Sequence, residues 1–349
     1  SKSYGIKTLF EDVTFGIDQG QKVAFVAKNG TGKSTMLRCI YGTESADSGR
    51  VVFRKDINVG FLEQQHDFKP GQKPIDIVLD SDSEEIKAIK KYQQLMAEGA
   101  SGDDFQDAFE EMNRLNAWEK EVRINEILSK LKLDTIQVTT EYFSGGQTKR
   151  TALARILVEE PDFLILDEPT NHLDLDMIEW LEDYLSKSNC TLFMVTHDRY
   201  FLDNVCNEII ELDEGAIYKY KGNYSYFLEK REERYDNLEV NIKKAKNLLR
   251  TELDWMRRQP KARGTKTKSR VSDFYDLKKK AYVKIDKSEI ELKINIQRLG
   301  TKILEFHKVS KAYGDLKLLD QFNYTFKRNE KVGIVGYNGS GKSTLLKMI

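Results

Sequence analysis

The chain has 349 residues, 40% of them apolar and 32% charged, which is enough for two ordinary domains with packed cores. Basic and acidic residues balance at 56 each, so the overall charge favours no class of partner. The three cysteines, Cys39, Cys190 and Cys206, lack the spacing of a metal site, and no apolar run approaches the ~18 residues that span a bilayer. These features argue against a disulfide scaffold and predict a cytoplasmic protein that binds no membrane.

A glycine-rich turn follows the first apolar strand that the sequence predicts. Residues 21–27 have the pattern of that strand, and a helix is expected from Lys33. The turn between them has the pattern of a P-loop, with Ala27 where the pattern starts with Gly. Backbone N–H groups in such a loop surround a phosphate, the lysine reaches the β- and γ-phosphates, and the serine hydroxyl binds Mg²⁺, here Ser34. The predicted nucleotide-binding residues are Asn29, Gly30, Thr31, Gly32, Lys33, Ser34 and Thr35.

The pattern changes from strand to helix between Ile75 and Leu133. Apolar residues recur at three- and four-residue steps from Phe105 to Leu115, with acidic residues between them. Residues 98–102 have the composition of a turn. We therefore expect a helical subdomain, about residues 75–160, inserted into an α/β domain.

The next informative motif precedes a helix and consists of Ser144, Gly145, Gly146 and Gln147. It resembles the signature motif of ATP-binding cassette domains, with Phe143 where that family usually has Leu. The resemblance implies that the four residues contact a γ-phosphate held by the P-loop of another cassette. A helix cap by Ser144 is the simpler alternative.

A short apolar strand, 163–166, ends in two carboxylates, and in a P-loop protein these have distinct roles. Asp167 is expected to contact Mg²⁺, and Glu168 to orient and deprotonate the attacking water. The resemblance to cassette domains implies four further roles. Gln64 would lie near the metal and the water, Asp174 would belong to the D-loop that faces the other cassette, His197 after the predicted strand 191–195 would contact the γ-phosphate, and Tyr4 would stack on adenine or else be a core tyrosine. The predicted catalytic residues are Glu168, His197 and Gln64, and the predicted Mg²⁺ ligands in this half are Ser34, Gln64 and Asp167.

A second helical pattern extends from about Gly222 to Leu299, and breaks at Pro260 and Gly264 predict a helical hairpin. Fourteen residues at the tip contain seven cations and no acids, which predicts contact with nucleic-acid phosphates rather than a merely solvated charge run. The predicted nucleic-acid-binding residues are Arg257, Arg258, Lys261, Arg263, Lys266, Lys268 and Arg270.

The P-loop recurs 309 positions later, and the aromatic that precedes it keeps its distance from the lysine. A strand is expected to open this second nucleotide domain at 303–306. The predicted domains are residues 1–217, a linker at 218–300, and the first part of a second cassette at 301–349. Turnover by this chain alone is expected to be poor, because each site also needs motifs of a complete second cassette. The second set of predicted nucleotide-binding residues is Tyr313, Asn338, Gly339, Ser340, Gly341, Lys342, Ser343 and Thr344, with Ser343 as a Mg²⁺ ligand.

Two cassettes joined by a hairpin with a basic tip resemble the ABC-F proteins, and residues 255–268 are most similar to the Uup subgroup. The resemblance implies a P-loop ATPase that converts ATP and water to ADP and phosphate with Mg²⁺, pairs with its own second cassette, and contacts transfer RNA and ribosomal RNA on the ribosome. DNA is an alternative polymer for the basic tip. Two alternative functions are the ATPase subunit of a membrane transporter and a DNA-binding ATPase of repair or recombination.

Overall fold

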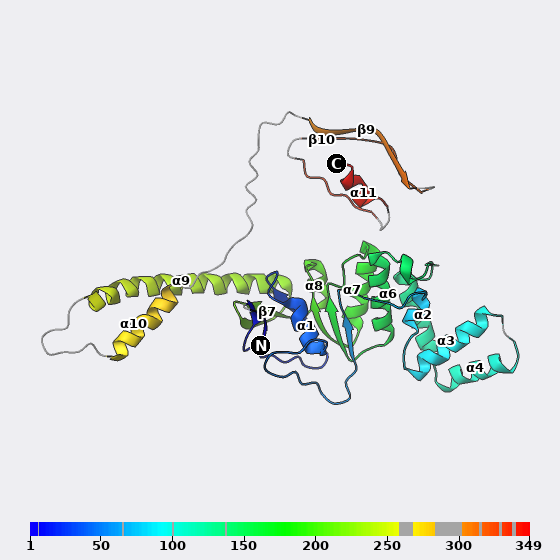
Figure 1. Cartoon of the computed structure of the whole chain (residues 1–349), viewed down its shortest axis with the longest axis horizontal. Coiled ribbons are helices and arrows are strands. Elements are labelled where there is room, and N and C mark those ends of the chain that lie inside the picture. Colours follow the sequence, from blue (N-terminus) through cyan, green and yellow to red (C-terminus); the bar gives the residue numbers. More distant parts are fainter. Residues whose placement is uncertain are drawn as a thin grey trace. The chain divides into compact units, whose positions relative to one another are not determined.

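The structure is a computed structural model (Figure 1) that describes residues 1–5, 7–64, 66–99, 101–136, 138–257, 268–282, 302–313, 316–327, 330–336 and 340–349. The chain divides into two compact units. The first comprises Ser1–Tyr224, Lys311–Leu319 and Val332–Ile349, and the second comprises Ser225–Ser310 and Asp320–Lys331.

A six-stranded sheet forms the centre of the first unit. Its order is β4-β5-β6-β3-β7-β8, and all neighbouring strands are parallel except β7 and β8. Both β5 and β6 are buried along their whole length, as expected for strands covered on both faces. The strands predicted at 21–27, 163–166 and 191–195 are thus confirmed. The six strands are β3 (Lys22–Ala27), β4 (Val59–Leu62), β5 (Phe163–Asp167), β6 (Thr191–Val195), β7 (Glu208–Asp213) and β8 (Ala216–Lys221).

Helices pack around this sheet and follow its strands in the chain (Figure 1). In the core, Phe193 on β6 lies 5.6 Å from Phe25 on β3, measured between ring centroids, and Leu37 of α1 packs into the same cluster. The carboxyl ends of parallel strands meet at one edge of a sheet, so the residues that follow β3, β5 and β6 come together there. The helices are α1 (Lys33–Tyr41), α6 (Gly145–Val158), α7 (Leu175–Lys187) and α8 (Arg199–Val205).

In the described residues, five α-helices lie between β4 and β5 in the chain; four of them precede the short 3₁₀ helix Thr140–Tyr142, and α6 follows it. Ala108 and Met112 form the buried face of α4, so the helical periodicity at 105–115 is confirmed. Tyr92 on α3 contacts Phe105 and Trp118, with ring centroids 5.5 and 5.2 Å apart. These aromatic contacts join three successive helices. The four helices are α2 (Pro74–Val78), α3 (Glu84–Ala97), α4 (Asp103–Arg114) and α5 (Trp118–Lys130).

The second unit starts at Ser225 and contains nearly all of the long helix α9 (Tyr224–Arg257) and the shorter α10 (Lys268–Ala281). Apolar residues of both helices pack together in a small cluster. Helix α9 begins at Tyr224, well before Leu238, where its apolar pattern becomes regular. The cluster consists of Ala245, Leu249, Leu253, Met256, Phe274, Leu277 and Ala281.

Two strand pairs reflect the internal repeat. In the first copy, β1 (Lys2–Tyr4) pairs with β2 (Lys7–Phe10), and in the second copy β9 (Lys302–Tyr313) pairs with β10 (Leu316–Lys327). The strand expected at 303–306 is therefore confirmed within β9. Helix α11 (Lys342–Lys347) begins at the position equivalent to the start of α1. In contrast, residues 331–336, which are equivalent to β3, join no strand in the part of the chain that the structure describes.

Candidate nucleotide-binding site

The loop between β3 and α1 turns through two glycines with positive φ, 77° at Gly30 and 91° at Gly32. Residues with a Cβ atom rarely adopt this conformation. A Cβ on Gly32 would also lie 2.8 Å from Leu9 Cδ1, too close for any side chain. Helix α1 starts at the next residue, so its unpaired N–H groups face the loop and favour an anion.

The side chain of Lys33 folds back over this loop. Its ammonium donates to the carbonyl oxygen of Ala27 at 3.1 Å and to Asn29 Oδ1 at 3.0 Å. Burial lowers the pKa of Lys33, while the charges of Glu168 and Asp167 oppose that effect. Phosphate oxygens are acceptors of the same kind as those that Lys33 now binds. The loop therefore fits a nucleotide phosphate through a simple exchange of hydrogen bonds.

The two carboxylates that end β5 are both buried, with 2% of Asp167 and 6% of Glu168 exposed. The backbone N–H of Glu168 donates to the Val195 carbonyl at 2.8 Å, which ties this end of β5 to β6. Glu168 Oε2 accepts from the backbone N–H of His197 at 3.3 Å, and Oε1 lies 3.5 Å from His197 Nε2. Burial raises the pKa of Glu168, and His197 counteracts it. The predicted base and the predicted switch histidine thus meet at one edge of the sheet.

The side chains near the loop suit Mg²⁺ that arrives with a nucleotide. Within the described ranges, no three His, Cys, Asp or Glu side chains are grouped closely enough to hold a metal ion. Mg²⁺ usually binds one or two carboxylates and completes its shell with phosphates and water. Ser34 in the first turn of α1 and Asp167 at the end of β5 supply a hydroxyl and a carboxylate of that kind. The donor set therefore fits Mg²⁺ bound with ATP, not a closed metal cage.

The signature residues start helix α6. Ser144 Oγ accepts from the Gln147 N–H at 3.2 Å, and Gln147 Oε1 accepts from the Ser144 N–H at 2.8 Å, forming a capping box. The helix cap foreseen as the simpler alternative is thus present. It still leaves the serine proton available for another acceptor. A Cβ on Gly146 would lie 3.6 Å from His172 Cβ, so the signature lies beside the segment that leads to Asp174.

Asp174 has partners within its own chain. Its carboxylate accepts from the Met177 N–H at 3.2 Å and so caps α7, and it lies 2.7 Å from the Lys132 ammonium. Only 5% of this side chain is exposed. The predicted D-loop residue is therefore anchored to the chain segment that follows α5.

Tyr4 and Gln64 are more open. Residue Tyr4, including its aromatic ring, is partly open to solvent, with 53% of the residue exposed, and its hydroxyl donates to Glu44. Lys2 lies over the same ring, with its ammonium 5.4 Å from the centroid. Gln64 is exposed in the loop that follows β4.

The second P-loop repeats two contacts of the first. Gly341 has a φ of 92°, and a Cβ on it would lie 3.2 Å from Leu318 Cβ, where Leu318 is equivalent to Leu9. The Lys342 ammonium donates to the Gly336 carbonyl at 2.6 Å, the position equivalent to Ala27. Ser343 and Thr344 lie in α11, which Ser340 precedes. The predicted residues Asn338 and Gly339, and the side chain of Tyr313, lie outside the described residues.

The basic tip of the linker is described only at its two ends. Arg257 ends α9, and Arg270 lies on α10. The Arg270 guanidinium donates twice to Glu252, from Nε and from Nη2 at 2.9 Å each, and lies 4.1 Å from the centroid of the Trp255 ring. Arg270 therefore links α10 to α9, and the phosphate contact predicted for it stays a prediction. The predictions for Arg258, Lys261, Arg263, Lys266 and the side chain of Lys268 lie outside the described residues.

Lys149 has a position that the sequence analysis missed. Its ammonium donates to the carbonyl oxygens of Glu63 and Asp167, at 2.9 Å each, and only 4% of the residue is exposed. The available signal is its spacing along α6, since the residues three and four positions later, Ala152 and Leu153, are buried. A lysine on a buried helical face indicates an internal partner.

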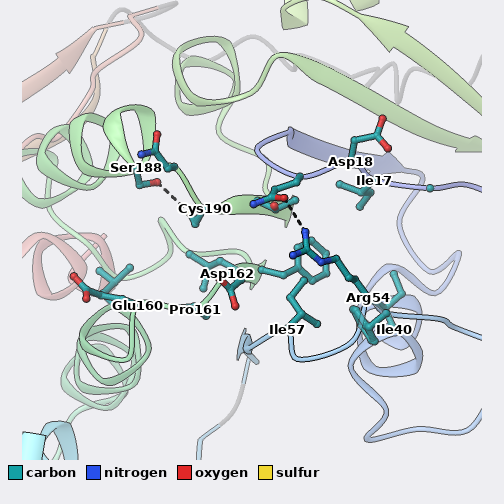
Figure 2. Close-up of a pocket in the computed structure, with 18 of the residues that line it drawn as sticks. Ile17, Asp18, Ile40, Arg54, Ile57, Glu160, Pro161, Asp162, Ser188 and Cys190 are labelled. Carbon is teal, nitrogen blue, oxygen red and sulfur yellow. Dashed lines mark hydrogen bonds between the residues drawn. The ribbon is translucent and has the colours of Figure 1, made fainter. Parts of the chain in front are cut away.

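A large cavity of about 1290 Å³ lies at the other edge of the sheet (Figure 2). Its lining includes Ile57, which lies just before β4. It also includes Asp162 and Cys190, which directly precede β5 and β6. Arg54 donates to Gln19 at 3.1 Å across this lining. Because the P-loop follows the carboxyl end of β3, the cavity lies opposite the predicted nucleotide site and is not part of it.

A family model described as ABC transporter matches residues 10–171 and 319–349, more than half of the chain. The chain belongs to the ABC transporter ATP-binding family. Domains of this family bind ATP, normally with Mg²⁺, and hydrolyse it. The sheet and P-loop described above are thus the cassette fold expected from the sequence. A second model, also described as ABC transporter, matches residues 210–294 across the linker.

Individual proteins show the same relationship over most of the chain. It is 40% identical to the uncharacterized ABC transporter ATP-binding protein YfmR of Bacillus subtilis, over the whole chain and 56% of that protein. It is 34% identical to the energy-dependent translational throttle protein EttA of Haemophilus influenzae, over 98% of this chain and 63% of EttA. The chain thus spans less than two thirds of the length of these relatives.

Among solved structures, the ATP-binding subunit of an ABC transporter is 21% identical, covering 63% of this chain and 86% of its own with a TM-score of 0.48. In the parts of the chain that the structure describes, no helix is both long and apolar enough to cross a membrane.

Proposed function

We propose that the protein is an ATPase of the ABC-F type, in which ATP binding and hydrolysis control docking of the α9–α10 linker on the ribosome. One observation carries this proposal. The P-loop, the carboxylates after β5 and the histidine after β6 share one sheet edge, and a second P-loop with the same lysine contact follows the linker. A protein with two P-loops joined by a basic linker is suited to bring two cassettes together around ATP.

The residues of the first site have complementary roles in this proposal. Lys33 exchanges its contacts with Ala27 and Asn29 for phosphate oxygens. Ser34, Gln64 and Asp167 would hold Mg²⁺, which would neutralise part of the phosphate charge when it is bound with ATP. Glu168 accepts the proton of the attacking water, and its burial raises its pKa above that of an ordinary carboxylate, although His197 opposes that effect. His197 orients Glu168 through its backbone N–H.

In this proposal, the signature and the D-loop act on the opposite cassette. Ser144 and the N–H groups at the start of α6 would contact the γ-phosphate bound by the P-loop of the opposite cassette. The neighbouring segment that ends at Asp174 would face that cassette as well. Bound ATP then joins the two cassettes, and hydrolysis releases them. Because the linker connects the cassettes, its orientation depends on which nucleotide is bound.

The translational role is supported by the relatives and by the linker. The H. influenzae relative is named as an energy-dependent translational throttle, and it is similar over nearly the whole chain. The cations at the linker tip suit an RNA backbone. Membership of the Uup subgroup rests on residues 255–268 alone. A transporter subunit would instead dock on a membrane partner, and a repair ATPase would bind DNA through the same cations.

Co-sedimentation with ribosomes tests the proposal. The protein would be the full-length form carrying Glu168→Gln and the matching change in the second cassette, so that ATP stays bound. We expect it to sediment with ribosomes in the presence of ATP and to remain in the supernatant without nucleotide. Lys33→Ala is the control, because it should lose the ATP dependence. Sedimentation that is equal with and without ATP, or retention on duplex DNA with no retention on ribosomes, would refute the translational role.

A further inference from the structure

Lys149 joins two strands at the point where they separate. Strands β4 and β5 are parallel, and their last paired positions are Leu62 and Leu166. The next residue in the chain is Glu63, directly after β4, or Asp167, the last residue of β5, and the Lys149 ammonium donates to the backbone carbonyl of both at 2.9 Å. The side chain therefore extends the strand pairing by one step. Beyond it, Gln64 departs into its loop.

The helix that carries Lys149 is held firmly against these strands. A Cβ on Gly60 of β4 would lie 2.9 Å from Ile156 Cγ2 of α6, so the helix packs directly on the strand backbone. Arg150, the next residue, donates from Nη1 to the Leu131 carbonyl at 2.7 Å. Helix α6 begins with Ser144 at its cap, five residues before Lys149. One rigid helix thus links the signature to the ends of β4 and β5.

Burial of the charged Lys149 ammonium costs free energy, and loss of its two hydrogen bonds would also cost free energy. Burial lowers the pKa of Lys149, and the charges of Asp167 and Glu168 oppose that effect. A side chain without donors would leave the buried Asp167 carbonyl and the part-buried Glu63 carbonyl without the hydrogen bonds that Lys149 now makes, and a buried polar group without a partner is destabilising. Packing alone would be satisfied by an apolar residue of the same length. The function of the ammonium is thus to hold two backbone segments together.

We propose that Lys149 is a positioning residue that fixes Gln64 relative to Asp167 and thereby sets the geometry of the Mg²⁺ ligands. This inference rests on the proposed function for the identity of the ligands, whereas the contact itself does not depend on it. Lys149 touches neither nucleotide nor metal in this role. It acts through the backbone of the loop that follows β4 and of the strand end that carries the carboxylates.

Three variants of this chain test the inference. Lys149→Met keeps the length of the side chain and removes the donors, Lys149→Arg keeps a cation with several donors, and Lys187→Met changes an exposed lysine of α7 as a matched control. The first measurement uses the nucleotide-free chain and follows amide hydrogen exchange in peptides covering residues 59–64 and 163–168. Lys149→Met should raise exchange by about tenfold in both peptides, because local opening becomes easier when hydrogen bonds are lost. Lys187→Met should leave both peptides unchanged.

The second measurement compares binding of N-methylanthraniloyl-ATP with and without Mg²⁺. Residues that orient metal ligands typically contribute ~10–100-fold to metal affinity, so in Lys149→Met the gain in affinity on adding Mg²⁺ should fall by about tenfold. The affinity of Lys149→Met for the ATP analogue without Mg²⁺ should stay within about twofold of the wild-type affinity, because the P-loop is unchanged. Lys149→Arg should recover part of the gain. A merely structural lysine would weaken both affinities together.

Each outcome separates this inference from the proposed function. Wild-type exchange rates and a wild-type Mg²⁺ gain in Lys149→Met would overturn the role of Lys149, although the chain would still be an ATP-binding protein. Failure of the wild-type chain to bind the ATP analogue would refute the proposed function and with it the Mg²⁺ role of Lys149. If Lys149→Met does not fold, Lys149→Gln replaces it; its amide nitrogen ends one bond short of the ammonium position, so this variant should show the same two changes to a smaller extent. Normal exchange and an undiminished Mg²⁺ gain in that variant would equally overturn the inference.

Discussion

The carboxylate of Glu168 lies 3.5 Å from the His197 ring nitrogen Nε2 and accepts the His197 backbone N–H, although 29 positions separate the two residues. Glu168 is buried and has a φ of 52°, whereas the His197 side chain is 67% exposed. One partner is therefore fixed by the fold, and the other has a surface that a bound nucleotide or a second cassette can reach. A buried carboxylate in a fixed position suits the role of a general base. An exposed histidine suits a residue whose contacts change when a nucleotide or a second cassette binds.

Glu168→Gln should keep ATP binding and slow hydrolysis by ~10²–10⁴-fold, because loss of a positioned base has an effect of this size. The amide retains the size of the carboxylate and an oxygen that can accept the His197 N–H. Single-turnover hydrolysis at the first site of the full-length protein would measure the effect. Glu119→Gln, on the exposed side of α5, is the control and should be neutral. An unchanged single-turnover rate in Glu168→Gln would mean that another group activates the water.

Gly32→Ala should weaken nucleotide binding and lower the melting temperature. The alanine would have to adopt a φ of 91° and place its Cβ 2.8 Å from Leu9 Cδ1. The left-handed conformation alone costs about 1–2 kcal/mol. Gly16→Ala, where a Cβ would have no neighbour within 4 Å and φ is not in the left-handed region, should be tolerated. Adding Leu9→Ala to Gly32→Ala should recover only part of the loss, and full recovery would show that backbone strain is unimportant there.

Replacing Arg257, Arg258, Lys261 and Arg263 with Ala should reduce both ribosome affinity and its dependence on salt. Each lost contact to a single-stranded phosphate lowers the slope of log affinity against log salt by about 0.7. Sedimentation at several salt concentrations with the ATP-trapped protein would give this slope. ATP affinity of the free protein is the internal control and should not change. An unaltered slope would place the ribosome contacts outside the linker tip.

Arg270→Ala should act on the linker itself, not on phosphate binding. Its guanidinium binds both oxygens of Glu252 and covers the Trp255 ring, so its loss should loosen α10 from α9. We expect earlier thermal loss of helicity and increased tryptophan exposure in the whole chain, with little change in salt slope. Glu252→Gln should have the same effect. If Arg270→Ala lowered the salt slope as much as replacement of a tip arginine does, Arg270 would be a phosphate-binding residue.

The three cysteines should react at different rates with iodoacetamide near neutral pH. Cys39 and Cys206 are buried, and burial raises the pKa of both thiols, which lowers the fraction present as reactive thiolate. Cys190 is half-buried and lies 3.1 Å from Ser188 Oγ. Mass spectrometry should find Cys190 modified first in the native chain and all three modified after denaturation. Equal native rates for Cys190 and Cys206 would contradict the burial described here.

The sequence predicts the central strands and the P-loop turn well, because each of them depends on residues that are close together in the chain. An apolar run such as 191–195 becomes a buried strand, and a glycine such as Gly32 marks a turn that other residues rarely make. Contacts between distant segments were not predictable in this way. Lys149 meets Glu63 across 86 positions, and Lys132 meets Asp174 across 42. Arg270 was grouped with the tip cations because the sequence does not show that the returning helix brings it back to Glu252.

Part of the P-loop geometry is found in both copies of the internal repeat. Around Lys342 the loop has the glycine conformation, the leucine contact and the lysine-to-carbonyl bond found around Lys33, yet residues 331–336 join no strand within the described residues. Within the described residues, this leucine and this left-handed glycine recur together beside both P-loop lysines, which makes them a repeated module of the two phosphate receptors. The surrounding domain contributes instead what such a module lacks by itself: the carboxylates, and their fixed distance from it.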